Sequence, residues 1–214
     1  LVDAGYTDTP VISLTFGDNL YNDQSAFKID WVKMLPIALR AVLYSDCINK
    51  FYHAALVREI NKGMAADLRK LYLEMGAELI EKGKSSELLK HLPFAAEDFN
   101  SICRDISLPK VGIVGEIYLK FNSFANRNIV DWLAEHHIEV EPPVLIDFFT
   151  QAFVNRKAKT NAHLLKRGLT DIAYRVLYHI VNHEIEKTNK LCSTFRHFTP
   201  FNDIFHEAKL AERV

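Results

Sequence analysis

The sequence has no long apolar run, little net charge and no visible targeting signal. No apolar stretch in its 214 residues approaches the length that crosses a membrane, so we expect a cytoplasmic protein without a membrane segment. A formal net charge of -1 argues against a protein built to bind nucleic acid. The chain begins at Leu1 rather than at a methionine, which indicates a piece of a longer protein.

Cysteine is scarce and widely spaced. The three cysteines are Cys47, Cys103 and Cys192, and no two of them have the short spacing of zinc or iron–sulfur ligands. We therefore expect reduced thiols, and no cofactor held by this chain alone.

The motifs of several enzyme classes are also missing. Gly112 and Gly115 have no third glycine to complete the dinucleotide fingerprint, and Glu116 follows where a phosphate loop would need a neutral or basic residue. No Walker loop, nucleophile with an adjacent base, or catalytic pair of carboxylates is present. A standard Rossmann cofactor site is thus excluded, and we expect no catalysis by this chain alone.

What is present is the composition of an ordinary globular domain, organised around residues 110–143. The apolar residues of Lys110 to Ile117, with Val111 and Val114 among them, predict a buried strand. The period then changes to that of a helix from Asn128, and Ile138 to Val140 predicts a second strand. A strand, helix and strand of this length indicate a parallel crossover unit.

A further strand is predicted near the beginning of the chain. Val11 to Phe16 alternates apolar and polar residues and ends at Gly17, Asp18 and Asn19. If the sheet is parallel, the loops after Phe16 and after Gly115 open on the same edge and form one cleft.

The remaining apolar periodicity is helical. Long helices are expected from Trp31 to Ile60, with a weakening at Asp46 to Tyr52, and from Leu68 to Ile80. One interrupted helix or two short ones should follow up to Cys103, with the break at Pro93. For Val144 to Phe149 the pattern leaves strand and helix open. A last helix is expected from Leu169, with an apolar face formed by Ile172, Ala173, Val176, Leu177 and Ile180. The four phenylalanines at positions 195, 198, 201 and 205 should pack inward.

These elements predict an α/β fold with a small parallel sheet flanked by helices. We expect residues 1–150 to form the α/β domain and residues 151–214 to form a mostly helical extension that packs on it.

The candidate ligand-binding residues lie where the two predicted strands end. Lys120 and Arg127 would neutralise an anionic ligand, and the amides would orient it. A solvated loop with capping asparagines is the structural alternative for the same residues. The full candidate set is Glu116, Lys120, Asn122, Asn126, Arg127 and Asn19.

A basic run in the C-terminal part of the chain has both a functional and a structural interpretation. The acid-free basic run Arg156, Lys157, Lys159, Lys166 and Arg167 is either a solvated helix face or a docking patch for a phosphate-bearing ligand or an acidic partner.

The histidines offer a weaker signal. His179 and His183 are four residues apart, which can place two imidazoles on one metal of a hydrolase, although His183 falls on the apolar stripe of a core or interface helix. His136 and His137 are expected to end a helix, where a cationic imidazole complements the dipole.

Two stretches carry a family resemblance, DAGYTDTPVISLTF and KVGIVGEIYLKFNSFANRNIVDWLAEHHIEV. They resemble the dehydratase-like region of activators of 2-hydroxyglutaryl-CoA dehydratase, also called CoA-substrate-specific enzyme activases. GEIYLKFNSFANRNIV is the most specific part. The segment at Leu56 to Gly63 keeps only part of the family's Arg-Pro-Tyr-Glu pattern, because the proline is missing.

The resemblance implies a flavodoxin-like (Rossmann-like) sheet and a role near ATP-driven electron transfer in an anaerobic bacterium. It also implies an activator ATPase domain and dehydratase subunits as partners, a CoA-type ligand, and a [4Fe–4S] cluster in the full-length protein. The family's cysteine segments lie outside this chain, so the cluster would need ligands from elsewhere. Two functions follow as hypotheses: a domain contributing to a cluster or CoA-ligand cleft, or a structural module that docks the ATPase to a dehydratase.

Overall fold

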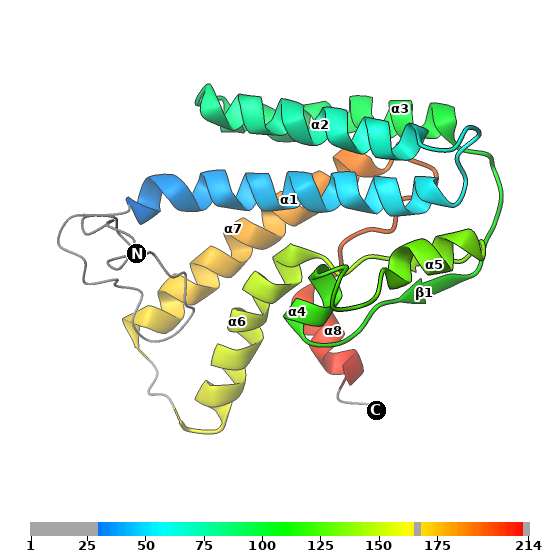
Figure 1. The fold of residues 1–214 in the computed structure, drawn as a ribbon. Helices are drawn as coiled ribbons and strands as arrows, with labels where there is room; N and C mark the ends of the chain where they lie inside the picture. The colour runs from blue at the N-terminus through cyan, green and yellow to red at the C-terminus, as the bar shows by residue number, and fades with distance from the viewer. Residues whose placement is uncertain (1–29, 165–167, 212–214) are drawn as a thin grey trace, which may run out of the picture. The chain divides into compact units, whose positions relative to one another are not determined.

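The computed structural model describes residues 30–164 and 168–211. The chain divides into two compact units, residues 1–36 and residues 37–214, and the architecture below is that of the second unit. It is mostly helical, with one small parallel sheet (Figure 1). No helix within the described ranges is long and apolar enough to cross a membrane.

The first helix, α1, is continuous from Trp31 to Leu56. The apolar pattern weakens at Asp46 to Tyr52, but the helix has no break there. The apolar pattern is interrupted there by Asp46 and Lys50, but both side chains are buried and have polar partners, so the helix continues through them. It ends before Ile60, and the chain turns towards α2.

Two helical segments follow, as predicted. Helix α2 spans Met64–Glu81, and the 3-10 helix η2 (Ser85–His91) leads into α3 (Leu92–Ile102). Pro93 lies in the first turn of α3, where its missing N–H costs no hydrogen bond, so the predicted interruption is confirmed. Helices α2 and α3 lie side by side, and α3 also packs against α7 (Figure 1).

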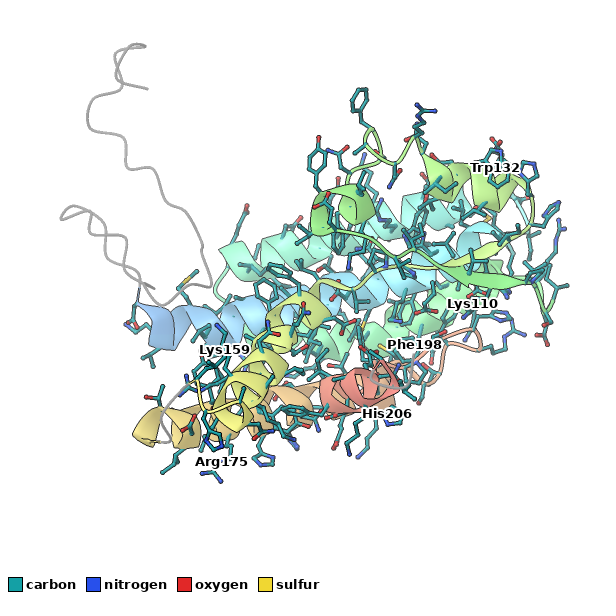
Figure 2. The ribbon with its side chains drawn as sticks, turned by 90° about the horizontal axis from the view of Figure 1, so that it is seen from below. Lys110, Trp132, Lys159, Arg175, Phe198 and His206 are labelled. Carbon is teal, nitrogen blue, oxygen red and sulfur yellow. The ribbon has the colours of Figure 1, made fainter. Side chains whose placement is uncertain are left out.

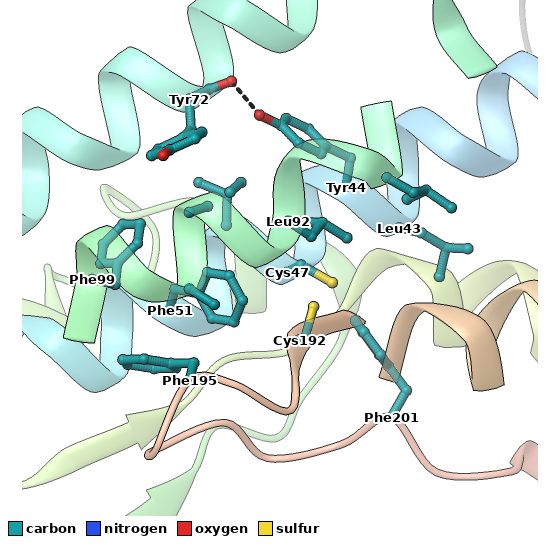
Figure 3. Packing of buried hydrophobic residues seen from close by; sticks show 14 of the residues in the cluster. Leu43, Tyr44, Cys47, Phe51, Tyr72, Leu92, Phe99, Cys192, Phe195 and Phe201 are labelled. Atoms are coloured by element: carbon teal, nitrogen blue, oxygen red, sulfur yellow. Dashed lines mark hydrogen bonds between the residues drawn. The ribbon is translucent and has the colours of Figure 1, made fainter. Parts of the chain in front are cut away.

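The hydrophobic core surrounds Phe51 of α1. Its ring contacts those of Phe99 and Phe195, with centroids 5.7 and 4.9 Å apart (Figure 3). It also contacts the ring of Phe198, at 5.8 Å. The prediction that the C-terminal phenylalanines pack inward is thus confirmed, since Phe201 is buried as well.

The cysteines are three buried, free thiols, as expected. Those of Cys47 and Cys192 point towards one another in the core (Figure 3). Burial first, and then the neighbouring Cys192 thiol, hold the pKa of Cys47 well above its usual range, which keeps it protonated and unreactive.

The predicted crossover unit is present. Strand β1 (Lys110–Gly112) pairs in parallel with β2 (Glu139–Glu141), in the register Val111 to Val140, and α5 (Ile129–Glu135) lies between them in the chain. In the part of the chain that the structure describes, these two strands form the only sheet.

The prediction of a buried strand at Lys110 to Ile117 is wrong. β1 is three residues long and exposed at each of them, and the side chain of Val114 is 92% exposed. A strand of a parallel sheet is buried only when layers cover both of its faces, and among the described residues no second layer covers β1. The buried strand is β2, in which Glu139 and Val140 are both buried.

The ambiguous run after Pro143 is a helix, α6 (Leu145–Asn161). Asp46 of α1 caps it, because its carboxylate accepts hydrogen bonds from the amides of Leu145 and Ile146 at 3.0 and 2.9 Å. Helix α6 passes through position 150, where we expected the boundary between domain and extension.

The C-terminal helices are α7 (Leu169–Cys192) and α8 (Ile204–Ala211). Helix α7 is where the sequence predicts it, but its core face is not the predicted one. Ile172, Val176 and Ile180 are exposed, and the buried face includes Val181 and Ile185. Both faces carry apolar residues, so periodicity alone could not select between them.

Glu139 lies between two cations. Its carboxylate accepts from the guanidinium of Arg58 at 2.7 Å and contacts the ammonium of Lys110 at 2.8 Å. Lys110 also reaches Glu141, which pairs with Lys50. The result is a chain of five alternating charges that joins α1 to both strands.

Glu139→Ala should destabilise the protein by about 3 kcal/mol, because it leaves the guanidinium of Arg58 buried without its charge partner. Equilibrium urea denaturation measures the change. Glu78→Ala, which removes an exposed ion pair with Lys82, is the matched control and should leave the midpoint unchanged. Equal effects of the two substitutions would mean that the ion pairs of Glu139 do not stabilise the protein.

Candidate ligand-binding segment

The segment between β1 and α5 contains a short helix where we predicted only a loop. Helix α4 spans Ile117–Phe121, and the carboxylate of Glu116 caps it by accepting from the amides of Tyr118 and Leu119 at 3.0 and 2.8 Å. Gly115, just before the cap, has φ +146°, a conformation that side chains other than glycine rarely adopt. Glu116 therefore has a structural role in the described structure.

The asparagines of the candidate set hold the turn that follows α4. Asn122 Oδ1 accepts from the amide of Ala125 at 3.0 Å, and Asn126 Nδ2 donates to the carbonyl of Leu119 at 3.1 Å. These are the hydrogen bonds expected of the structural alternative, a loop with capping asparagines. Asn126 Oδ1 is buried and has no hydrogen-bond partner among the described residues.

Unlike Glu116 and the asparagines, the two cations of the candidate set have no side-chain partners among the described residues. Neither Lys120 Nζ nor the Arg127 guanidinium takes part in an ion pair or a side-chain hydrogen bond with another described residue. Arg127 lies in the left-handed turn that leads into α5, with φ 55°. Both cations are therefore available to an anionic ligand, as the sequence hypothesis requires.

Large apolar side chains lie on the surface around these cations. Phe124 is 89% exposed, and Tyr118 and Trp132 are more than half exposed. Trp132 stacks on His136, with ring centroids 4.2 Å apart, and lies at the outer side of α5 (Figure 2). An exposed group of this kind, rimmed by polar residues, is typical of a binding surface.

An open groove of about 540 Å³ lies on the same segment. It is lined by Ile117, Tyr118, Phe121, Asn122 and Ser123, so its walls combine apolar and aromatic surface with two small polar side chains. Its volume is within the range of small-molecule sites, but it is open to solvent along its length.

A cluster of carboxylates lies where α6 begins, near Lys120. The pKa of Asp147 is raised to about 7, first by burial and then by the negative charges of Glu207 and Asp46, against the ammonium groups of Lys50 and Lys120, which lower it. Burial likewise raises the pKa of Asp46 to about 6, against the two amides that bond to it. Sequence reasoning missed this cluster, since its members come from separate helices.

The other candidates find less support in the geometry. Asn19 and the strand predicted at Val11 to Phe16 lie outside the described residues, so the expected cleft with residues 116–127 stays a prediction. His179 and His183 are both exposed, and the apolar stripe expected to bury His183 is itself exposed. No group of three potential metal ligands occurs in residues 30–164 or 168–211.

The basic run is partly engaged within the protein. Arg156 forms an ion pair with Asp171 at 2.9 Å and lies over the ring of Tyr174, and Lys157 lies over that of Phe205. Lys166 and Arg167 are outside the described residues. These contacts agree with the structural interpretation of the run as a helix face.

Comparison with known proteins gives no relative: no family model, no curated protein and no solved structure matches this chain.

Glu116→Ala should loosen α4 without unfolding the protein, because it removes the cap from the Tyr118 and Leu119 amides. Hydrogen exchange, measured amide by amide, should be faster at these two positions and unchanged in α1. Glu135→Ala, in the last turn of α5, is the control. Unchanged exchange in α4 would mean that the cap does not hold this segment.

Proposed function

We propose that this chain is a dehydratase-like domain of an acyl-CoA dehydratase activator that works in the cytoplasm. In the complete protein it contributes residues 116–127 to a cleft for a CoA-type ligand, next to ATP-driven electron transfer, and it is catalytically inert alone. A sheet of flavodoxin-like topology, larger than the two described strands, belongs to the same proposal.

The observation that carries the proposal concerns the stretch GEIYLKFNSFANRNIV. This stretch gives the family resemblance, yet packing does not explain its composition: Tyr118, Phe121 and Phe124 are exposed instead of filling the core. Large apolar side chains that a protein keeps on its surface in one contiguous segment indicate recognition of something else.

The chemistry of the segment suits a CoA-type ligand. The phosphates of such a ligand are anions that Lys120 and Arg127 can bind, and its adenine is a ring that can stack on an aromatic side chain such as Tyr118. The segment contains no cysteine, so a [4Fe–4S] cluster in the complete protein would take its ligands from outside this chain. Within the two ligand types of the hypothesis, the described residues therefore favour CoA.

A second candidate function is that of a docking module between the activator ATPase and a dehydratase subunit. The exposure of Val114, Phe124 and Trp132 favours it, because aromatic and aliphatic anchors dominate the energetics of protein interfaces. The docking surface would then be this segment, since Arg156 and Lys157 already have partners within the chain.

The double variant Lys120→Ala/Arg127→Ala tests the ligand site. Each charge-assisted hydrogen bond to a phosphate contributes on the order of 2 kcal/mol, so the affinity for coenzyme A should fall at least about thirtyfold. Isothermal titration calorimetry on the whole chain measures it. Lys157→Ala/Lys159→Ala removes the same charge elsewhere and should bind as the unmodified protein does. Equal affinities of the two double variants would refute the site.

The docking candidate makes a different prediction. Val114→Ser/Phe124→Ser should weaken binding to the dehydratase subunits at least about tenfold, because each truncation at an interface core removes more than about 1 kcal/mol, and should leave coenzyme A binding unchanged. Surface plasmon resonance with purified subunits measures the first effect. If the double variant binds the dehydratase subunits as tightly as the unmodified protein does, Val114 and Phe124 have no role in docking.

A further inference from the structure

Strand β1 has an open edge. Glu139 donates its amide hydrogen to the carbonyl of Pro109 at 2.8 Å, and the register pairs Lys110 with Glu139. In a parallel pair with this register, alternate residues of β1 bond to β2, so the amide and carbonyl of Gly112 point away from β2. Neither group has a hydrogen-bond partner among the described residues. An unpaired edge of this kind is a template for another strand.

Lys110 does not protect this edge. A lysine that projects over an edge keeps other strands away, but the ammonium of Lys110 is directed across its own sheet. It contacts Glu139 at 2.8 Å and Glu141 at 3.3 Å, and it donates to Thr199 Oγ1 at 2.6 Å. Val114, two residues beyond the strand, is 92% exposed. The edge therefore offers unpaired backbone groups and apolar surface to a partner.

We propose that this edge is an interface between two copies of the chain. Residues 110–114 pair in antiparallel with the same residues of a second copy, about a twofold axis through Ile113, and the two small sheets become one sheet of four strands. Two strands alone form a marginal sheet, which the pairing extends. This inference goes beyond the proposed function and does not depend on it, because the chain itself supplies the partner.

The sequence of residues 110–116, KVGIVGE, is complementary to itself in this register. With the axis at Ile113, Gly112 faces Val114, Val111 faces Gly115, and Lys110 faces Glu116. Large side chains thus face glycines and opposite charges face one another, as a contact between identical surfaces requires. Gly115, with φ +146°, ends the extended run, so the hydrogen-bonded ladder is confined to the residues around Ile113.

Gly112 has space for a side chain of the second copy. A Cβ atom built on Gly112 would have no heavy atom within 4 Å, so this face of the strand is open. In the proposed register, Val114 of the second copy covers the opening, and it exchanges two backbone hydrogen bonds with Gly112. Moving the axis to Gly112 would place two glycines opposite one another and leave both openings empty. Packing therefore favours the axis at Ile113.

The first experiment is sedimentation equilibrium of the whole chain, without ligand or other protein, which should show a reversible dimer. Gly112→Pro removes the amide that points to the edge and leaves the bonds to β2 in place. It should weaken dimerisation at least about tenfold, because each copy loses one hydrogen bond. Melting curves check that the variant folds.

A second variant tests the same edge without changing the backbone. Val114→Lys places an exposed lysine on the edge and should also weaken dimerisation at least about tenfold. Phe94→Lys is the matched control, since Phe94 is an exposed apolar residue of α3 and lies outside the proposed interface. It should leave dimerisation unchanged.

Cross-linking tests the register. The Cα atoms of a non-hydrogen-bonded antiparallel pair are about 4.5 Å apart, which a disulfide can span. Oxidised glutathione, which accepts the two electrons and is released as two thiols, should therefore link two copies of Ile113→Cys. In Val111→Cys the equivalent atoms are about 14 Å apart, so this control should remain unlinked. The three native thiols are buried, and the unmodified protein measures their background.

Three results would overturn the proposal. They are a monomer at every concentration, a dimer that neither Gly112→Pro nor Val114→Lys weakens, and equal cross-linking of the two cysteine variants. A monomer that Gly112→Pro destabilises would mean that a strand of the same chain occupies the edge instead. None of these measurements involves coenzyme A, so the proposed function stands or fails separately.

Discussion

The arrangement of this protein depends on the chain of ion pairs from the buried Arg58 through Glu139, Lys110 and Glu141 to the buried Lys50. Burying so many charges has a large desolvation cost, which is offset only because each carboxylate has two cationic neighbours. This chain of ion pairs attaches β1 to the helical body, because β1, unlike β2 with its buried Val140, buries no side chain and has no hydrophobic means of attachment. Its lysine provides an electrostatic one.

This mode of attachment explains why the segment between the strands presents apolar residues to solvent. The two strands are fixed at the start and the end of the crossover, so the residues between them need not pack into the core to be held in place. The cap by Glu116 and the two asparagine hydrogen bonds maintain the local fold instead. Tyr118 and Phe124 are therefore not required for packing and remain on the surface. The hydrogen bonds that hold this segment are thus separate from the apolar side chains on its surface.

The sequence predicted the positions of helices and strands better than it predicted which of their faces are buried. The period of apolar residues located α2, α3 and α7 because it reports helix geometry, which is local. It failed where two faces of a helix were both apolar, as at Ile172 and Val181, since the choice between them is made by the packing partner. It failed at β1 for the same reason: an apolar strand is buried only if the rest of the fold supplies layers over it. At Asp46 and Lys50 the apolar pattern weakens although both residues are buried, because their polar partners are far away in sequence.

The candidate site shows the same division between local and long-range information. The rule that ligands meet a parallel sheet at its strand ends directed attention to residues 116–127, and the hydrogen bonds there then separated the structural Glu116 from the available Lys120. Asp147 could not be found in this way. Its significance comes from charges on three other helices, and no spacing in the sequence encodes their convergence. The half-burial of Asp147 and the convergence of charges from separate helices on it are properties of the folded chain, which spacing along the sequence does not report.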